Sequence, residues 1–236
     1  ITCDFTVWDL PQFDSAGEMM LKNANGGALS MLTTNRPIGT IYGSAFNSYL
    51  LNELFRENNH QNISTGKALM EAKKNYNVTS LDHSKVNLLG DPMVAVSRPK
   101  QDVQITRFKV NGEEVDFNSH QIKALDFIEI EGEVLKPNAQ LDETFTGNIQ
   151  NILYEKPVTK PLRNNKGFAN FTPYSFTEEF KTIYKGTSKV TDGKFTIKYY
   201  VPKDINYELG DRKLVLYAYS EQSDAVMHTK VKVGGL

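Results

Sequence analysis

The only cysteine of the chain, Cys3, is the residue best suited to covalent chemistry. It lies in the short apolar run of residues 1–5, with no histidine beside it, and would stand at the carboxyl end of a strand. A thiol becomes an effective nucleophile only where a base or a positive charge promotes its ionisation. Spacing alone therefore favours a small, inert, buried side chain, and a catalytic role requires a partner from elsewhere.

The four histidines do not supply that partner by their sequence positions. His60 and His83 lie in polar stretches, where solvent exposure is the ordinary expectation, and His120 and His228 lie in the strand-rich second part. A pKa near 6.5 is the one property that favours a role for such residues. Trp8 could line a substrate cleft, but core packing is the preferred interpretation.

Three acidic residues near Cys3 raise the question of a metal. Asp4, Asp9 and Asp14 could surround a hard cation, but they lack the glycine and the terminal glutamate of a calcium loop. One cysteine also excludes a zinc site built from several thiolates and an internal disulfide. We expect neither a metal nor any other cofactor. Asp91, which precedes a proline, is expected to form a turn.

The segments that must position Cys3 follow it in a distinctive order. Residues 26–37 read Gly-Gly-Ala-Leu-Ser-Met-Leu-Thr-Thr-Asn-Arg-Pro, and residues 88–92 read Leu-Leu-Gly-Asp-Pro. This order resembles the second half of the gingipain-like cysteine peptidases of family C25. The resemblance implies that a strand ends in the nucleophilic Cys3, that a Gly-Gly strand and two helices follow, and that Leu-Gly-Asp-Pro closes a caspase-like domain.

The resemblance extends past the peptidase domain. Residues 108–117, 130–133 and 184–205 look like the region that follows that domain in the gingipain-like sortase of the type IX secretion system. It implies a bacterial protein at the outer-membrane cell surface that cleaves the C-terminal signal from exported cargo through a Cys3 thioester. Surface lipopolysaccharide would be an acceptor, and other secretion-system components would be partners.

The same resemblance sets what this chain can do alone. It assigns Cys3 as the nucleophile, with its backbone N–H as one oxyanion donor, and places the catalytic histidine in a His-Gly motif upstream of Ile1. We therefore expect the chain alone to be inactive. A free thiol with a pKa near 8.5 is only a few per cent ionised at neutral pH.

Composition excludes some functions. The 27 basic and 28 acidic residues nearly cancel, so no overall field would recruit nucleic acid or an anionic membrane. No apolar run approaches the roughly 18 residues that a membrane span needs, so we expect a chain that does not cross the bilayer. If the protein is exported, as the resemblance implies, its export signal lies upstream of Ile1.

The first part, residues 1–98, has the pattern of an α/β domain. Ser15 and Glu18 form a capping box for a short helix, a buried strand is expected over 28–34, and helices are expected over 44–56 and from Ser64 to Tyr76. A short strand over 86–89 follows. This alternation indicates a parallel sheet covered by helices, the C-terminal half of a caspase-like or gingipain-like domain.

The second part, residues 99–236, has the pattern of an all-β domain. Asn111-Gly112 predicts a two-residue hairpin, and residues 127–134 alternate as a half-buried strand does. Turns are expected at Asp192-Gly193 and over 209–211, whereas 154–177 reads as a long loop with little structure. The spacing indicates an immunoglobulin-like antiparallel β-sandwich.

Two functions of different class remain open. The chain is either part of a peptidase or sortase, or part of a surface scaffold that has lost catalysis and binds partners through the sandwich. A His-Gly motif just upstream of Ile1 would favour the first. In either case the strand that bears Cys3 should leave an exposed sheet edge, through which the chain associates with itself or with an upstream fragment.

Overall fold

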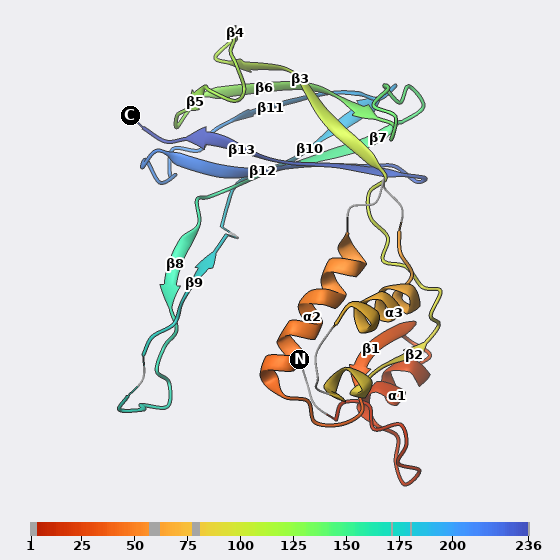
Figure 1. Cartoon of the computed structure of the whole chain (residues 1–236). Coiled ribbons are helices and arrows are strands. Elements are labelled where there is room, and N and C mark those ends of the chain that lie inside the picture. Colours follow the sequence, from red (N-terminus) through yellow and green to blue (C-terminus); the bar gives the residue numbers. More distant parts are fainter. Residues whose placement is uncertain (1–3, 57–61, 77–80, 171, 180, 236) are drawn as a thin grey trace. The chain divides into compact units, whose positions relative to one another are not determined.

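The structure is a computed structural model that describes all residues except 1–3, 57–61, 77–80, 171, 180 and 236 (Figure 1). The chain divides into two compact units, an N-terminal unit of Ile1–Arg98 and a C-terminal unit of Pro99–Leu236. Each has its own cluster of buried apolar side chains. The identities expected for the two domains stay predictions.

The N-terminal unit contains three α-helices, one 3-10 helix and two strands among its described residues. In chain order these are α1 (Ala16–Lys22), β1 (Ser30–Thr34), α2 (Thr40–Phe55), α3 (Thr65–Asn75), η1 (Leu81–Lys85) and β2 (Val86–Gly90). The capping box of Ser15 and Glu18 is confirmed, and Ser64 caps α3 by accepting from the backbone N–H of Lys67. The second helix begins at Thr40, one turn earlier than expected.

The expected parallel sheet is wrong for the described strands of this unit. β1 and β2 pair antiparallel, with Ser30 opposite Gly90 and Thr34 opposite Val86. β1 is also only half-buried over most of its length. The helices between the two strands return the chain to the same end of the pair, and this direction of return is not encoded in the apolar pattern of either strand.

The core of the N-terminal unit lies between α2, α3 and the strand pair. The rings of Phe46 and Tyr76 meet edge to face with their centroids 5.3 Å apart. The Tyr76 hydroxyl donates to the carbonyl of Tyr42 over 3.0 Å. The buried apolar side chains are those of Ile38, Phe46, Leu50, Leu54, Ala68, Leu69, Ala72, Tyr76 and Val86.

The C-terminal unit is built on one long sheet that closes on itself. Its strands are β3 (Gln101–Val110), β4 (Glu113–Glu114), β5 (Gln121–Ile122), β6 (Phe127–Leu135), β7 (Gly147–Tyr154), β10 (Thr182–Thr191), β11 (Lys194–Tyr200), β12 (Gly210–Tyr219) and β13 (Asp224–Val233). Their order is β4-β3-β6-β11-β10-β7-β12-β13-β5. A parallel contact of Ala225 and Val226 with Gln101 and Asp102 joins β13 to β3 and completes a barrel.

The barrel confirms an all-β second part, and the immunoglobulin-like sandwich stays a prediction. The seam between β10 and β11 is narrow, because only Val190 with Phe195 and Thr191 with Lys194 are paired. Side chains that point inward from the strands fill the interior, among them Ile128, Ile149 and Leu216, which are fully buried. A filled interior makes this barrel a packed core.

Two hairpins expected from the sequence are confirmed. Asn111 and Gly112 have φ values of 53° and 87° and join Val110 to Glu113, which are paired. Positive φ at both central residues is the requirement of the turn that matches the twist of an antiparallel pair. Asp192 and Gly193 make the same kind of turn. The turn expected over 209–211 is wrong, because β12 begins at Gly210.

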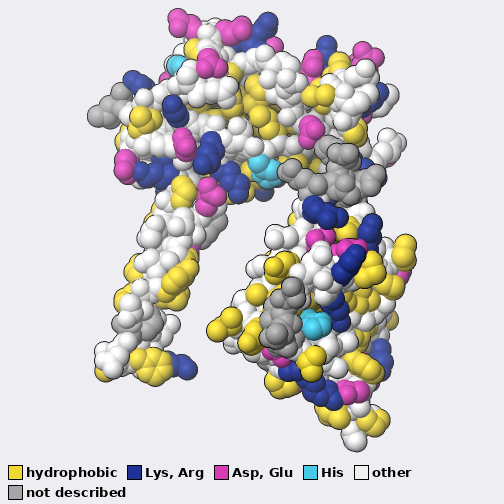
Figure 2. Space-filling model, viewed as in Figure 1, with side chains coloured by type: hydrophobic (Ala, Val, Ile, Leu, Met, Phe, Trp, Pro, Cys, Tyr) yellow, Lys and Arg dark blue, Asp and Glu magenta, His cyan; other side chains and the backbone are white. Residues whose placement is uncertain are grey.

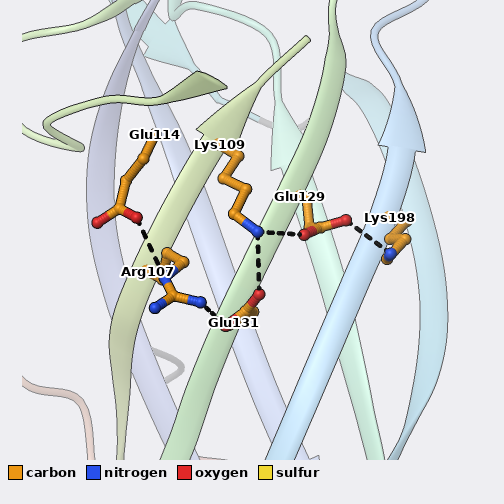
Figure 3. A network of polar contacts seen from close by, with 6 residues as sticks. All are labelled: Arg107, Lys109, Glu114, Glu129, Glu131 and Lys198. Carbon is orange, nitrogen blue, oxygen red and sulfur yellow. Dashed lines mark hydrogen bonds and ion pairs between the residues drawn. The ribbon is translucent and has the colours of Figure 1, made fainter. Parts of the chain in front are cut away.

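A network of charged side chains covers the outer face of β3, β6 and β11 (Figure 3). Glu129 accepts from Lys109 at 3.1 Å and from Lys198 at 2.6 Å. Glu131 pairs with Lys109 and with Arg107, and Arg107 also pairs with Glu114. The opposite charges neutralise one another across the three strands, which keeps this face soluble.

The segment expected to be a loop is instead a projecting two-stranded arm. β8 (Val158–Pro161) pairs antiparallel with β9 (Ser175–Glu178), and the arm, residues 157–179, extends away from the barrel (Figure 1). The pairing escaped the sequence analysis because all four residues of β8 are exposed, so no alternation of buried and exposed side chains marks the strand.

A buried ion pair lies at the root of the arm. The Nε atom of Arg212 is 2.6 Å from the carboxylate of Glu155, and both side chains are almost fully buried. Glu155 also accepts from the backbone N–H groups of Lys156 and Asn206, while Arg212 donates to the Asn206 carbonyl. The pair therefore ties the chain just before the arm to the barrel wall.

Candidate functional site

The expected nucleophile, Cys3, lies outside the described residues, so the site is defined by the segment that follows it. Thr6 is fully buried, its backbone N–H donates to the Thr34 carbonyl over 3.3 Å, and its hydroxyl donates to the Thr33 hydroxyl over 2.9 Å. The chain just after Cys3 is thus attached to the carboxyl end of β1. No pattern in the sequence indicates this contact, because it joins residues far apart in the chain.

The N-terminal end of α1 holds the same segment from the other side. The Gly17 N–H donates to the Phe5 carbonyl over 3.1 Å. A Cβ atom at Gly17 would lie 2.3 Å from the Thr6 hydroxyl oxygen, closer than real Cβ atoms approach a neighbour. Glycine at this position lets α1 approach the Thr6 side chain closely. This close packing holds Phe5 and Thr6 against α1.

Two of the three acidic residues near Cys3 are held in ion pairs. Both guanidinium Nη atoms of Arg36 donate to the Asp9 carboxylate, and Lys22 Nζ pairs with Asp14 at 2.5 Å. The hydrogen bond from Arg36 holds the pKa of Asp9 below its ordinary value. Among the described residues no cluster of acidic, histidine or cysteine side chains could hold a metal ion.

A hollow of about 280 Å³ lies beside the end of β1. It is bounded by apolar side chains, with hydroxyl and amide groups on β1 and α2; its lining residues are Leu32, Thr33, Thr34, Ile38, Gly43, Phe46, Asn47, Leu50 and Val86. Since Thr6 bonds to Thr33 and Thr34, the hollow adjoins the segment after Cys3. It has the size and character to receive one apolar side chain.

Among the other sequence candidates, His83 lies in η1, which leads into the residue of β2 that pairs with this end of β1, and Asp91 follows β2 at the opposite end. His60 is outside the described residues. The His83 ring lies 6.3 Å from that of Tyr76, centroid to centroid, on the side of the unit formed by η1. His120 and His228 belong to the C-terminal unit. Asp91 forms the expected turn by accepting from the Met93 N–H over 2.8 Å.

Trp8 corrects an expectation. Core packing was preferred for it, but the residue is 49% exposed, and Leu10 and Phe13 near it are exposed too. An apolar residue is expected to be buried only where its neighbours on the same face are apolar too. The run from Trp8 to Phe13 does not meet this condition, because Asp9 and Pro11 interrupt it. Exposed apolar and polar side chains are therefore interspersed along residues 8–13.

No helix within the described ranges has the length and apolar character that crossing a membrane requires.

Comparisons with known proteins agree with the motifs. Residues 1–97 match the model of peptidase family C25. No curated protein matches the chain in sequence. In structure the chain is similar to dimeric latent PorU from Porphyromonas gingivalis, with a TM-score of 0.52 and 23% identity, over 78% of this chain and 18% of that one. A weaker likeness, with a TM-score of 0.33 and 10% identity, covers 58% of this chain and 50% of the sporulation control protein Spo0M from Bacillus subtilis.

These findings confirm the resemblance to gingipain-like C25 peptidases for the N-terminal unit. The likeness to PorU shows a shared fold, and the chain spans less than a fifth of PorU.

Proposed function

We propose, from the premise that residues 1–97 are the C-terminal part of a gingipain-like C25 peptidase, that the parent protein is a cysteine peptidase of the sortase kind. Its substrate would be the C-terminal signal of exported cargo, at the outer-membrane surface of a bacterium that uses type IX secretion. The family match over residues 1–97 carries this proposal, and the shared fold with PorU supports it.

The chemistry proposed for Cys3 needs one group from the rest of the parent protein. The Cys3 thiolate attacks the carbonyl carbon of the scissile peptide bond, and backbone N–H groups, including that of Cys3, stabilise the oxyanion. The carbon–nitrogen bond then breaks, and the released amine takes a proton from the histidine that the family places upstream. A thioester between cargo and Cys3 remains.

The second step decides between hydrolysis and transfer. Water attacking the thioester gives a free carboxylate, whereas an amine gives a new amide, and in both cases the Cys3 sulfur leaves and regains its proton. Surface lipopolysaccharide that carries an amine is the proposed acceptor. The hollow beside β1 would receive an apolar side chain of the cargo next to the reacting bond.

The anchoring of the segment after Cys3 supports a positioned nucleophile. The Thr6 hydroxyl is hydrogen-bonded to β1, and Gly17 packs against the Thr6 side chain. These two contacts fix the position of Thr6. A nucleophile must be held close to one geometry to react efficiently, and a buried anchor three residues away serves that purpose.

Processing of a cargo signal by the full-length parent protein tests the proposal. Cys3→Ala should lower signal removal by roughly three orders of magnitude or more, as loss of a nucleophile does. Asp14→Asn is the matched control, because Asp14 lies in the same segment and its described contact is an exposed ion pair with Lys22. Unchanged processing by a folded Cys3→Ala protein would contradict the proposal.

A soluble amine added to the reaction separates the two outcomes of the thioester. Incorporation of that amine at the new cargo C-terminus, read by mass spectrometry, would establish transfer. Only a free carboxylate would establish hydrolysis.

A surface scaffold without catalysis is the second candidate. The projecting arm favours it, because every described residue from 157 through 175 is exposed and available to a partner. A parent protein that lacks the His-Gly motif and processes no cargo would fit this function.

A further inference from the structure

The end of the arm has an ordered shape. The Leu162 N–H donates to the Tyr174 carbonyl over 2.8 Å, which continues the ladder of β8 and β9 beyond their last paired residues. The Asn164 side chain then brackets Phe168, accepting from its N–H at 2.9 Å and donating to its carbonyl at 2.8 Å. These bonds hold the turn at the end of the arm without burying any of its side chains.

Large apolar side chains on the arm face solvent. Phe168 is 63% exposed and Tyr174 is 69% exposed, while Val158 and Leu162 are each about half exposed. Figure 2 shows hydrophobic side chains along the arm and at its end. A two-stranded ribbon without a core is only marginally stable in water, and clustered exposed apolar groups mark a contact surface.

The charge of the same segment has one sign. Residues 157–175 contain Lys160, Arg163 and Lys166 and no aspartate or glutamate. Lys160 pairs with Glu178, and Glu179, the other acidic residue of the arm, pairs with Lys213 of the barrel. Arg163 and Lys166 form no ion pair with any residue that the structure describes. The end of the arm therefore carries two uncompensated positive charges beside its aromatic side chains.

We propose that the end of the arm docks on an anionic lipid surface. Phe168, Tyr174 and Leu162 enter the headgroup region, and Arg163 and Lys166 bind lipid phosphates. Tyrosine, with an apolar ring and a polar hydroxyl, settles at the membrane interface, and phenylalanine and leucine insert beside it. Each nearby cation strengthens attachment to anionic lipid. Attachment needs both kinds of side chain, and the arm provides both.

The exposure of both faces of the arm favours a lipid surface over a protein groove as its binding partner. Both faces of the ribbon expose side chains between 157 and 175, whereas docking in a groove or on a sheet edge uses one face or one edge. A headgroup layer contacts an inserted ribbon from all sides. The attraction is local, because the chain as a whole is nearly neutral.

Sedimentation of the full 236-residue chain with vesicles tests the docking. Vesicles of phosphatidylcholine mixed equally with phosphatidylglycerol should bind the chain, and vesicles of phosphatidylcholine alone should bind it far less. The variant R163Q/K166Q should lower binding to the anionic vesicles by about thirtyfold, from the effect expected for two cations near a membrane. Binding should also weaken steeply when salt rises toward 1 M, where the screening length is about 3 Å.

A matched variant separates a docking site from general attraction. Lys185 and Lys189 are exposed on β10 and form no ion pair with described residues, so K185Q/K189Q removes the same charge from the barrel. It should bind as the original chain does. Equal loss in the two variants, or no preference of the chain for anionic vesicles, would overturn the proposal.

Fluorescence reports whether the end of the arm enters the lipid. Trp8 is the only tryptophan and is exposed, so the variant W8F/F168W places the single indole on the arm. Its emission should shift to shorter wavelength with anionic vesicles, and a second indole variant, W8F/Y200W, on the barrel should not shift. If the emission of W8F/F168W does not shift while substitutions in the arm change the oligomeric state, the end of the arm forms a protein contact and the lipid proposal is wrong.

Discussion

At the scale of single residues, the contact between Thr6 and Gly17 places the segment that follows Cys3. The contact leaves no space for a methyl group, because a Cβ at Gly17 would lie 2.3 Å from the Thr6 oxygen and 2.8 Å from its methyl carbon. Both belong to a buried side chain that also bonds to Thr33. The structure therefore uses glycine here for close packing.

Gly17→Ala is expected to destabilise the N-terminal unit. In an exposed helix this change would add about 1 kcal/mol of stability, but overpacking a buried contact costs about 1–3 kcal/mol. We expect a net loss in the free energy of unfolding, measured by denaturant titration. T6A/G17A removes the crowding atoms and should recover part of the loss; a more stable Gly17→Ala protein would show that the contact is looser than the structure has it.

Residue types predicted local contacts well and distant ones poorly. Ser15 and Glu18 are three positions apart, so their capping box is readable from the sequence. Asp9 and Arg36 are 27 positions apart, and no sequence pattern pairs them. Cys3 was assigned from family motifs, and its own geometry lies outside the described residues.

At the scale of elements, the predictable parts are those whose conformation is set locally. Asn111-Gly112 predicted a hairpin because few residues accept positive φ, and alternation in β6 predicted a strand because one of its faces is buried. The arm was missed because no face of β8 is buried. The antiparallel pairing of β1 with β2 was missed because strand direction depends on the path between them.

The charged face of β3, β6 and β11 should make stability depend on acid. Hydrogen bonds from Lys198 and then Lys109 hold the pKa of Glu129 below its ordinary value of 4.5. The folded state thus binds fewer protons than the unfolded state near that pH. The contribution of Glu129 is present above pH 4.5 and is lost as pH falls through the lowered folded-state value.

Thermal unfolding followed from neutral to acidic pH measures this contribution. The original chain should lose more stability on acidification than Glu129→Gln, which has no carboxylate to protonate. Glu143→Gln is the control, because Glu143 is exposed and forms no ion pair with described residues. Parallel pH curves for the original chain and Glu129→Gln would refute the assignment.

At the scale of the whole molecule, each unit has its own buried cluster, but the two units differ in surface. The N-terminal unit exposes large apolar side chains at several places, including Leu29, Ile41, Leu81 and Met93. The barrel instead carries charge networks on its outer strands. The N-terminal unit thus offers an apolar surface for association in addition to the exposed apolar side chains of the arm.

The chain should therefore associate with itself through the N-terminal unit. Light scattering at rising protein concentration should show a growing average mass. L29K/I41K should raise the dissociation constant of self-association at least tenfold, since burial of each large apolar side chain contributes about 1.5–3 kcal/mol. V158K/L162K is the control on the arm. A mass that stays monomeric at every concentration would contradict this expectation.

The Arg212–Glu155 pair gives the arm a mechanical property. Glu155 lies two residues before the arm and is held from three sides, by Arg212, by the Asn206 N–H and by its own bond to the Lys181 carbonyl. A load applied at Phe168 therefore meets a clamped root, as a beam fixed in a wall does, and its torque passes into β7 and β12.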